Sequence, residues 1–206
     1  MINQQMGSFF FLGELLTTLD LAPDGPPPDR CGTCTRCIAA CPTDAIVPRG
    51  GGEFELDAKL CISYFTIELR AAIHGINRVA NGNHVFGCDI CQDVCPWNRK
   101  APRKAEVQNE ANPYFAPPLD RLAALTEADF RDLFRHTPVS RAKYAGFLRN
   151  VAVAMGNSGL RKFREPLEKL ATCGMPLVEE HAAWALDQLL TPNRRAKSRR
   201  PPGHCP

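Results

Sequence analysis

Eight of the ten cysteines in this 206-residue chain have the spacing of iron–sulfur ligands. The first run, residues 31–42, reads C-x2-C-x2-C-x3-C-P, which is the ligand pattern of bacterial ferredoxins. The second run, residues 88–96, reads C-x2-C-x3-C-P and is one cysteine short, and Cys61 is the natural replacement. Each iron of a cubane takes one thiolate, so closely spaced cysteines wrap one face while the last ligand comes from elsewhere. In two-cluster ferredoxins the cysteine before proline binds the other cluster.

The sequence therefore predicts two 4Fe–4S clusters with crossed ligand sets, close enough to exchange electrons. The first set is Cys31, Cys34, Cys37 and Cys95, and the second is Cys41, Cys61, Cys88 and Cys91. Zinc is the alternative for any C-x2-C pair, but the triple run and the two Cys-Pro ends argue against it. Two cysteines lie outside the pattern and receive no role: Cys173, interpreted as a buried hydrophobe, and Cys205, interpreted as a free thiol.

The elements that must position these ligands can be outlined from local patterns. Residues 46–47 and 54–56, separated by a segment with three glycines, predict a short hairpin. Residues 57–73 read as one helix with Asp57 as a possible N-cap. Its apolar stripe is Leu60, Tyr64, Ile67 and Ala71, and near a second face lie Ser63, Arg70 and His74. The spacing alone favours the interpretation that this second face is polar and exposed to solvent.

A helical region is predicted after residue 120. Thr126 and Asp129 resemble a capping box. A helix near Ser140 should end within residues 156–159, and two more helices should follow at 160–170 and 177–190. The apolar stripe of the first of these helices is Tyr144, Phe147, Leu148, Val151 and Met155. Residues 147–155 align with 178–186, which suggests a helix-pair repeat, although two unrelated amphipathic helices would give the same pattern.

The predicted fold class is α+β, a ferredoxin-like two-cluster domain followed by an all-α HEAT-like repeat domain. The segments are a junction at 1–28, with helix-compatible leucine spacing between Phe9 and Leu21, and the cluster domain at 29–100. A connector at 101–119, a HEAT-like domain at 120–192 and a basic disordered tail at 193–206 complete the chain.

Charge and hydropathy limit the function classes. The formal net charge is +3, and five cations after Asn193 supply more than that excess, so the basic character belongs to the tail. The more specific interpretation of that tail is a segment that binds phosphate groups, and the simpler one is a solvent-exposed disordered end. No apolar run is long enough to cross a bilayer and no positive leader precedes residues 9–12, so we expect a cytoplasmic protein that does not bind membranes. Ten cysteines in such a protein favour metal over disulfides.

Three segments resemble the epoxyqueuosine reductase family: CGTCTRCIAACPTDAI at 31–46, CISYFTIEL at 61–69 and FGCDICQDVCPWN at 86–98. The stretch GSFFFLGELL at 7–16 is similar to the family's entry into its cluster domain, and residues 140–190 are similar to its helical repeats. The resemblance covers nearly the whole chain.

The resemblance implies an oxidoreductase that reduces epoxyqueuosine to queuosine at the wobble position of tRNA. The family uses cobalamin and two 4Fe–4S clusters fed by a low-potential electron donor. It also implies that Ser63, Cys88 and Asp89 lie near cobalamin and that Arg70 lies near tRNA. The helical domain would grip the anticodon stem-loop with basic residues such as Arg141, Lys143, Arg149, Arg161 and Lys162.

One departure from the family concerns its first domain. Family members carry a further domain before the stretch that begins at Gly7 in this chain. That domain holds most of the cobalamin pocket and the acid that donates a proton. The catalytic acid is therefore unknown here, and we expect a truncated or split monomeric enzyme, with little activity alone, whose other half could be encoded separately. A standalone electron-transfer protein with a helical partner-binding domain is the alternative, and a reductive dehalogenase is a more remote one.

Overall fold

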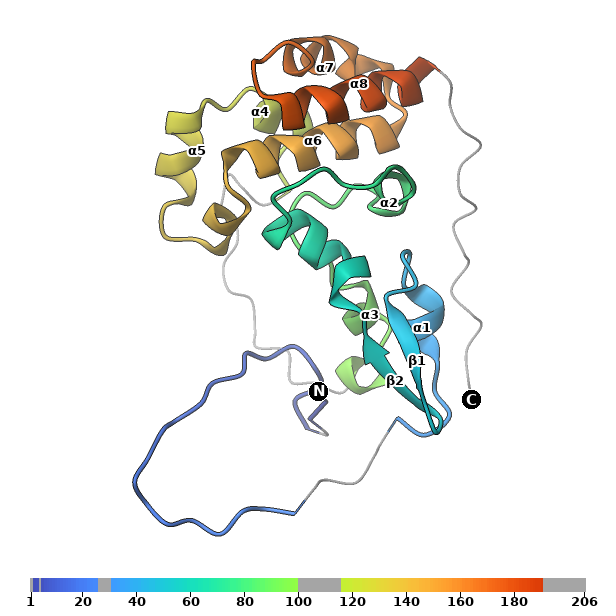
Figure 1. Ribbon diagram of the computed structural model, residues 1–206, viewed down its shortest axis with the longest axis vertical. Coiled ribbons are helices and arrows are strands. Elements are labelled where there is room, and N and C mark those ends of the chain that lie inside the picture. The colour runs from blue at the N-terminus through green and yellow to red at the C-terminus, as the bar shows by residue number, and fades with distance from the viewer. Residues whose placement is uncertain (1, 4, 26–30, 100–115, 191–206) are drawn as a thin grey trace.

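The computed structural model describes residues 2–3, 5–25, 31–99 and 116–190. The basic tail, Cys205 and most of the predicted connector lie outside these ranges. Figure 1 shows a helical half, α4 to α8, packed above a smaller half that contains the hairpin and the two cysteine runs. Residues 57–74, called the linking segment, lie between the cysteine runs in the sequence and are located where the two halves meet.

The smaller half is built from short elements around the cysteine runs. The first run leads into α1 (Arg36–Ala40), and the second passes through α3 (Ile90–Asp93) and η3 (Pro96–Arg99). The predicted hairpin is confirmed: β1 (Ile46–Gly50) pairs antiparallel with β2 (Glu53–Leu56), with Ile46 opposite Leu56.

The linking segment is not the single helix predicted for residues 57–73. It forms a short 3-10 turn, η1 (Ala58–Leu60), and a π-helical turn, η2 (Tyr64–Glu68), and is then extended from Leu69 until α2 (Gly75–Ala80). Asp57 caps η1 as predicted, accepting the Lys59 N–H at 2.9 Å. His74 is the N-cap of α2, so it shares no helix face with Ser63 and Arg70, and that part of the prediction was wrong.

The helical half follows the predicted pattern closely. Its elements are α4 (Leu119–Ala123), α5 (Glu127–Phe134), η4 (Pro138–Ala142), α6 (Tyr144–Ser158), η5 (Arg161–Phe163), α7 (Arg164–Leu170) and α8 (Pro176–Leu190). The capping box of Thr126 and Asp129 is present at the start of α5. Helix α6 ends at Gly159, whose positive φ of 65° provides the left-handed cap that glycine adopts without strain.

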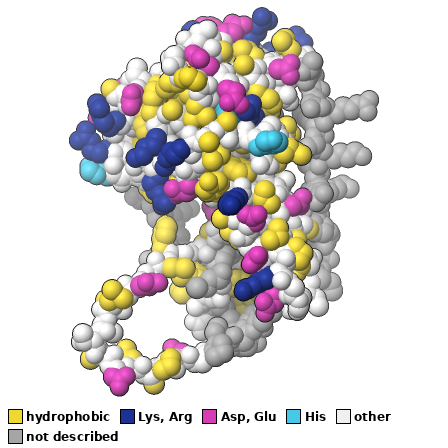
Figure 2. Space-filling model, viewed as in Figure 1, with side chains coloured by type: hydrophobic (Ala, Val, Ile, Leu, Met, Phe, Trp, Pro, Cys, Tyr) yellow, Lys and Arg dark blue, Asp and Glu magenta, His cyan; other side chains and the backbone are white. Residues whose placement is uncertain are grey.

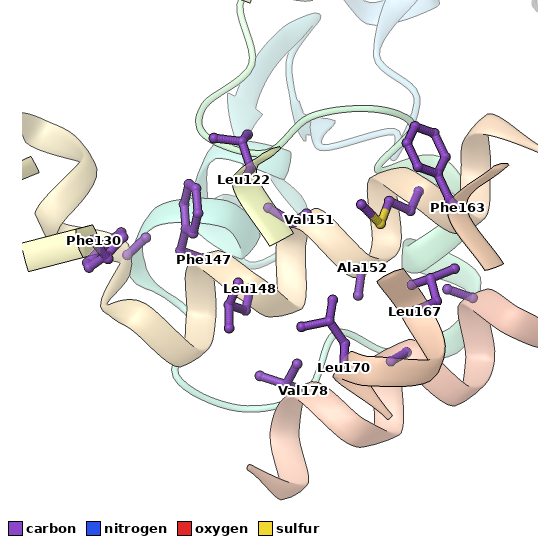
Figure 3. Close-up of a cluster of buried hydrophobic side chains, with 14 of the residues drawn as sticks. Leu122, Phe130, Phe147, Leu148, Val151, Ala152, Phe163, Leu167, Leu170 and Val178 are labelled. Atoms are coloured by element: carbon purple, nitrogen blue, oxygen red, sulfur yellow. The ribbon is translucent and has the colours of Figure 1, made fainter. Parts of the chain in front are cut away.

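One face of α6 forms the centre of the helical core. Figure 3 shows side chains of α4 to α8 pointing toward one another around Phe147, Val151 and Ala152. The ring of Phe147 lies 5.1 Å from that of Phe130 and 5.6 Å from that of Phe134, in tilted contacts that aromatic pairs prefer. The apolar stripe read from the sequence is therefore the core face of this helix.

The other face of α6 is polar and equally buried. Arg149 is 1% exposed and Asn150 is fully buried, so the expectation that Arg149 contacts tRNA was wrong. The Arg149 guanidinium instead donates to the carbonyls of Phe65, Leu69 (2.9 Å) and Ala71 (2.7 Å) in the linking segment. Burial, and then the charge of Arg70, lower its pKa to about 10, which leaves it charged at neutral pH.

Three successive carbonyls of η2 are capped by side chains rather than by the helix itself. Phe65 accepts from Arg149, Thr66 accepts from Asn150 at 2.8 Å, and Ile67 accepts from Arg70 at 3.0 Å. The last carbonyls of any helix lack partners in the helix, so these side chains complete the turn and let the chain become extended. This is the physical reason that the predicted long helix is cut short.

The apolar segment near the N-terminus is not helical in the described residues. Leu12, Leu15, Leu16 and Leu19 are exposed, and Figure 1 shows the segment as a wide extended arc. A short isolated helix is marginal in water unless an apolar face is buried, and the described residues offer this one no such surface. Ser8 is held by Asn98, whose Oδ1 accepts the Ser8 N–H at 2.6 Å.

Among the described residues, none of the helices combines the length and the apolar character needed to cross a bilayer.

Gly156 marks the closest approach of α6 to α8, which gives a stability prediction. A Cβ at this position would lie 2.8 Å from Cα and Cβ of Ala185, and helix backbone cannot yield cheaply. We expect Gly156→Ala to destabilise the protein by about 1–3 kcal/mol through overpacking.

Gly146 in the same helix is the control, because a Cβ there meets only the tip of Arg149 at 3.9 Å. Gly146→Ala should be neutral or stabilising by about 0.5–1 kcal/mol. Denaturant midpoints of the two variants measure both effects, and equal losses would contradict this packing.

His181 of α8 gives a prediction about pH. It is fully buried, its Nε2 accepts the Ile73 N–H at 3.0 Å, and its Nδ1 lies 2.7 Å from the Leu177 carbonyl oxygen, so the ring is neutral. Its pKa is lowered from 6.5 to about 4, chiefly by burial and also by Arg78 and Arg149, against the opposite effects of the Leu177 carbonyl and Glu180.

The unfolded chain therefore binds more protons than the native one between about pH 4 and 6.5, so the free energy of unfolding rises with pH across that window and is lost on acidification. We expect His181→Gln to be less stable than the parent at pH 7 and to lose less stability on acidification. Chemical denaturation at several pH values measures this. The exposed His136 provides the matched variant, His136→Gln, which should keep the parent's slope; a parallel slope for His181→Gln would refute the assignment.

Candidate metal centre

Three of the four cysteines in the first predicted ligand set, Cys34, Cys37 and Cys95, are brought together from both cysteine runs. Burial raises the pKa of the Cys37 thiol, and the neighbouring Cys34 and Cys95 thiols raise it further. Cys95 thus lies within electrostatic range of the first run although it belongs to the second. Cys37, Cys95 and Cys91 also line a cavity of about 360 Å³ whose apolar wall includes Phe10 and Ile46. An apolar cavity lined by thiols suits an iron–sulfur cluster.

The second predicted set is also gathered. Burial raises the pKa of the Cys88 thiol, as do Cys61 and Cys41. Burial likewise raises the pKa of Cys91, followed by Cys88, Cys37, Cys61 and Cys41 in order of effect. Cys61 therefore joins the cysteines of the two runs, as its position between them predicted. Cys31, the remaining predicted ligand, is exposed at the start of the first run.

The arrangement favours clusters over single ions. Seven of the eight predicted ligands act on one another's thiol pKa values, which is more than the four that a single ion would take. A zinc site needs its four ligands around one metal, whereas each thiolate of a cubane binds a different iron. The residues present therefore fit iron–sulfur clusters, and metal binding would have to displace the protons that burial retains on the thiols.

The loop that carries Cys88 is held by the linking segment. The Cys88 N–H donates to Ser63 Oγ at 3.1 Å, and the Gly87 N–H donates to Thr66 Oγ1 at 3.0 Å. Ser63 and Cys88 are therefore neighbours, with Asp89 exposed beside them and accepting from Gln92 at 2.8 Å. The structure thus groups the three residues that the resemblance assigns to cobalamin.

Arg70 lies at the far end of η2 from these residues. Its side chain is exposed, but its guanidinium donates to the Arg141 carbonyl at 2.7 Å and the Ala142 carbonyl at 3.5 Å. Arg141 in turn pairs with Glu68. Arg70 therefore joins η2 to η4, directly before Lys143.

The predicted basic residues of the helical half do not form one patch. Arg141 and Lys143 precede α6, and Arg161 and Lys162 follow it, so the two pairs are separated by a 15-residue helix roughly 22 Å long. All four are exposed. Figure 2 shows dark blue side chains on the left of the helical half and others along its top.

Sequence reasoning missed Thr66 and Asn150, both fully buried. The signal for Asn150 was present: a polar pair interrupts an otherwise apolar helix between Leu148 and Val151. Apolar flanks on both sides are typical of a buried polar group with dedicated partners. No comparable signal marked Thr66, because threonine is common on exposed helix faces.

Comparison with known proteins agrees with this geometry. Residues 30–98 match the family model described as a 4Fe-4S double cluster binding domain. The chain is 40% identical over 188 residues to the epoxyqueuosine reductase of Escherichia coli K12, covering 91% of this chain and 48% of that protein. It is 42% identical over 190 residues to that of Xanthomonas campestris, covering 91% and 52%. The chain thus spans about half the length of these curated relatives.

Solved structures give the same result. The epoxyqueuosine reductase of Bacillus subtilis, with its catalytic loop swung out of the active site, superimposes with a TM-score of 0.79 at 29% identity, covering 97% of this chain and 56% of that one. An epoxyqueuosine reductase crystallised with a tRNA-Tyr stem loop bearing epoxyqueuosine gives a TM-score of 0.69 at 29% identity, covering 86% and 50%.

The ligand assignment predicts the effect of removing Cys61. We expect Cys61→Ser to reduce the iron content from about eight to about four atoms per chain, since one of two cubanes loses a ligand. Iron and sulfide analysis after anaerobic reconstitution measures this. Cys173→Ser should retain both clusters, because Cys173 packs against the helical core. A Cys61→Ser chain with undiminished iron, or a parent chain that contains zinc, would refute the assignment.

Proposed function

The chain belongs to the epoxyqueuosine reductase family over the part of those proteins that it matches, and we propose that it serves the reduction of epoxyqueuosine to queuosine in tRNA. The observation that carries the proposal is the 40% identity across 91% of the chain, including the double-cluster region. A tRNA substrate also supports the cytoplasmic location expected from the sequence.

The two halves of the fold take separate tasks in this proposal. Residues 29–100 form a ferredoxin-type unit that holds two 4Fe–4S clusters and receives electrons from a low-potential donor. Residues 120–192 form a HEAT-like scaffold. The repeat is supported by α6 and α8, whose aligned residues Val151 and Ala182 are both fully buried, as are Ala154 and Ala185.

Cobalamin is the proposed electron acceptor, and bound cobalamin would supply a reduced cobalt for the epoxide. Ser63, Cys88 and Asp89 would line one side of its site. Ser63 holds the Cys88 backbone on both sides, accepting its N–H at 3.1 Å and donating to its carbonyl at 3.4 Å. These bonds would keep a ligand of the second cluster fixed beside the cofactor.

The proposed tRNA surface starts where η2 meets η4. Lys143 is exposed and has φ 60° and ψ 157°, a conformation that non-glycine residues rarely adopt. The Arg70 bonds to Arg141 and Ala142 hold the backbone just before it. Arg70 remains a predicted tRNA contact. Its hydrogen bonds would also position the Lys143 side chain for contact with the tRNA.

Conversion of epoxyqueuosine on a tRNA stem-loop tests the function. The cluster-loaded chain is supplied with cobalamin and a low-potential reductant, and the nucleoside is followed by mass spectrometry. A second arm adds the unmatched half of the Escherichia coli relative. Conversion in either arm supports the proposal. A chain that cycles electrons but binds neither cobalamin nor tRNA, without conversion in either arm, would establish general electron transfer instead.

Removal of one proposed phosphate contact gives a quantitative prediction. We expect Lys143→Ala to weaken stem-loop binding and to reduce the slope of log K against log salt by about 1, because one fewer counterion is released. Fluorescence anisotropy at several salt concentrations measures this. The exposed Lys59 of η1 is the control, and Lys59→Ala should bind as the parent does. Identical slopes for Lys143→Ala and the parent would remove Lys143 from the interface.

A further inference from the structure

The loop Val85–Cys88, which leads to a ligand of the second cluster, is held at three of its four residues. The Val85 carbonyl accepts from Asn150 at 2.9 Å. The N–H groups of Gly87 and Cys88 donate to the hydroxyls of Thr66 and Ser63. All three partners lie outside the loop, two on the linking segment and one on α6.

Asn150 connects these anchors. One Nδ2 hydrogen goes to Val85, and the other goes to the carbonyl of Thr66 at 2.8 Å. Its Oδ1 accepts from Arg149 Nε at 3.1 Å and Nη2 at 2.9 Å. Arginine can only donate hydrogen bonds, so the Asn150 amide has one possible orientation and both of its N–H groups face the smaller half. A single buried side chain therefore fixes both the loop and the residue that holds the loop.

The anchors decide where two backbone N–H groups point. The reduction potential of an iron–sulfur cluster depends on hydrogen bonds to its sulfurs, which stabilise the more negative reduced state. Cys41 Sγ accepts the Ala45 N–H at 3.3 Å, which shows such a bond to a ligand of this set. The N–H groups of Gly87 and Cys88 are instead occupied by hydroxyl oxygens and are withheld from sulfur.

We infer that Asn150 is a positioning residue for the second cluster. By fixing Val85 and Thr66, it keeps the Gly87 and Cys88 N–H groups on hydroxyls and thereby holds the potential of the cluster bound by Cys41, Cys61, Cys88 and Cys91 low. The helical half, through this one amide, sets the driving force of the electron step. The inference rests on the two-cluster assignment and not on the identity of the tRNA substrate.

Asn157 provides a matched control. It lies two turns further along α6, and its Nδ2 also donates to two carbonyls of the smaller half, those of Arg78 at 2.7 Å and Gly82 at 2.8 Å. Neither carbonyl belongs to the loop Val85–Cys88. A general loosening of the interface should therefore affect Asn150 and Asn157 variants alike, whereas a positioning role should not.

The test is a redox titration of the reconstituted chain followed by electron paramagnetic resonance, with amide hydrogen exchange at Gly87 and Cys88 as a second readout. Asn150→Leu removes both donors at a similar side-chain volume and adds no charge, and Asn150→Ala is a second neutral variant. We expect Asn150→Leu to shift one of the two reduction steps to a more positive potential and to speed exchange in the loop. Asn157→Ala should lower the melting temperature and leave both steps unchanged.

Ser63→Ala gives an independent route to the same result. It removes the acceptor of the Cys88 N–H directly, so it should shift the same reduction step in the same direction. Combined with Asn150→Leu, the shift should be smaller than the sum of the two, because both changes release the same N–H. Equal shifts from Asn150→Leu and Asn157→Ala, or lost stability with unchanged potentials in both Asn150 variants, would overturn the inference. A parent chain that shows both reduction steps but does not convert the tRNA substrate would count against the proposed function alone.

Discussion

The structure depends on how the carbonyls at the end of η2 find partners. A five-residue π-helical turn leaves terminal carbonyls without donors of its own, and the extended segment after it supplies only the Arg70 side chain to one of three successive ones. Arg149, Asn150 and Arg70 donate to three successive carbonyls, and two of these side chains come from α6. Removing a buried donor leaves its acceptor without water or a protein partner, at a cost of about 1–3 kcal/mol for each group. The junction between the two halves is therefore specified by hydrogen bonding as well as by apolar packing.

This constraint explains why α6 is buried on two sides. Phe147, Val151 and Met155 serve the helical core, while Val153 joins the smaller core of Ile62, Phe65 and Ile73. In the described part of the smaller half few apolar side chains are buried, which is usual for small units that rely on metal for stability. Docking on α6 gives it a rigid surface that it could not form alone.

The features that could be predicted from sequence are those set by local chemistry. Cysteine spacing, the capping box at Thr126, the hairpin at residues 46–56 and the core stripe of α6 each follow from neighbours within a few residues. The end of η2 could not be predicted, because it is decided by donors about 80 residues away in the chain. Arg149 was assigned to the surface because a charge in a helix usually lies there. The four leucines between Leu12 and Leu19 have helical spacing, but a helix also needs a surface to cover its apolar face.

The burial of Arg149 affects the electrostatics of the whole smaller half. Within the described part of the chain its hydrogen-bond partners are carbonyl and amide oxygens, so no carboxylate neutralises it. A cubane with four thiolate ligands is an anion and becomes more negative when it accepts an electron. A guanidinium inside a medium of low dielectric constant acts on such a charge with little screening by solvent ions. Arg149 thus places a positive charge in the interior beside the linking segment, and dissolved ions screen its field much less than that of an exposed arginine.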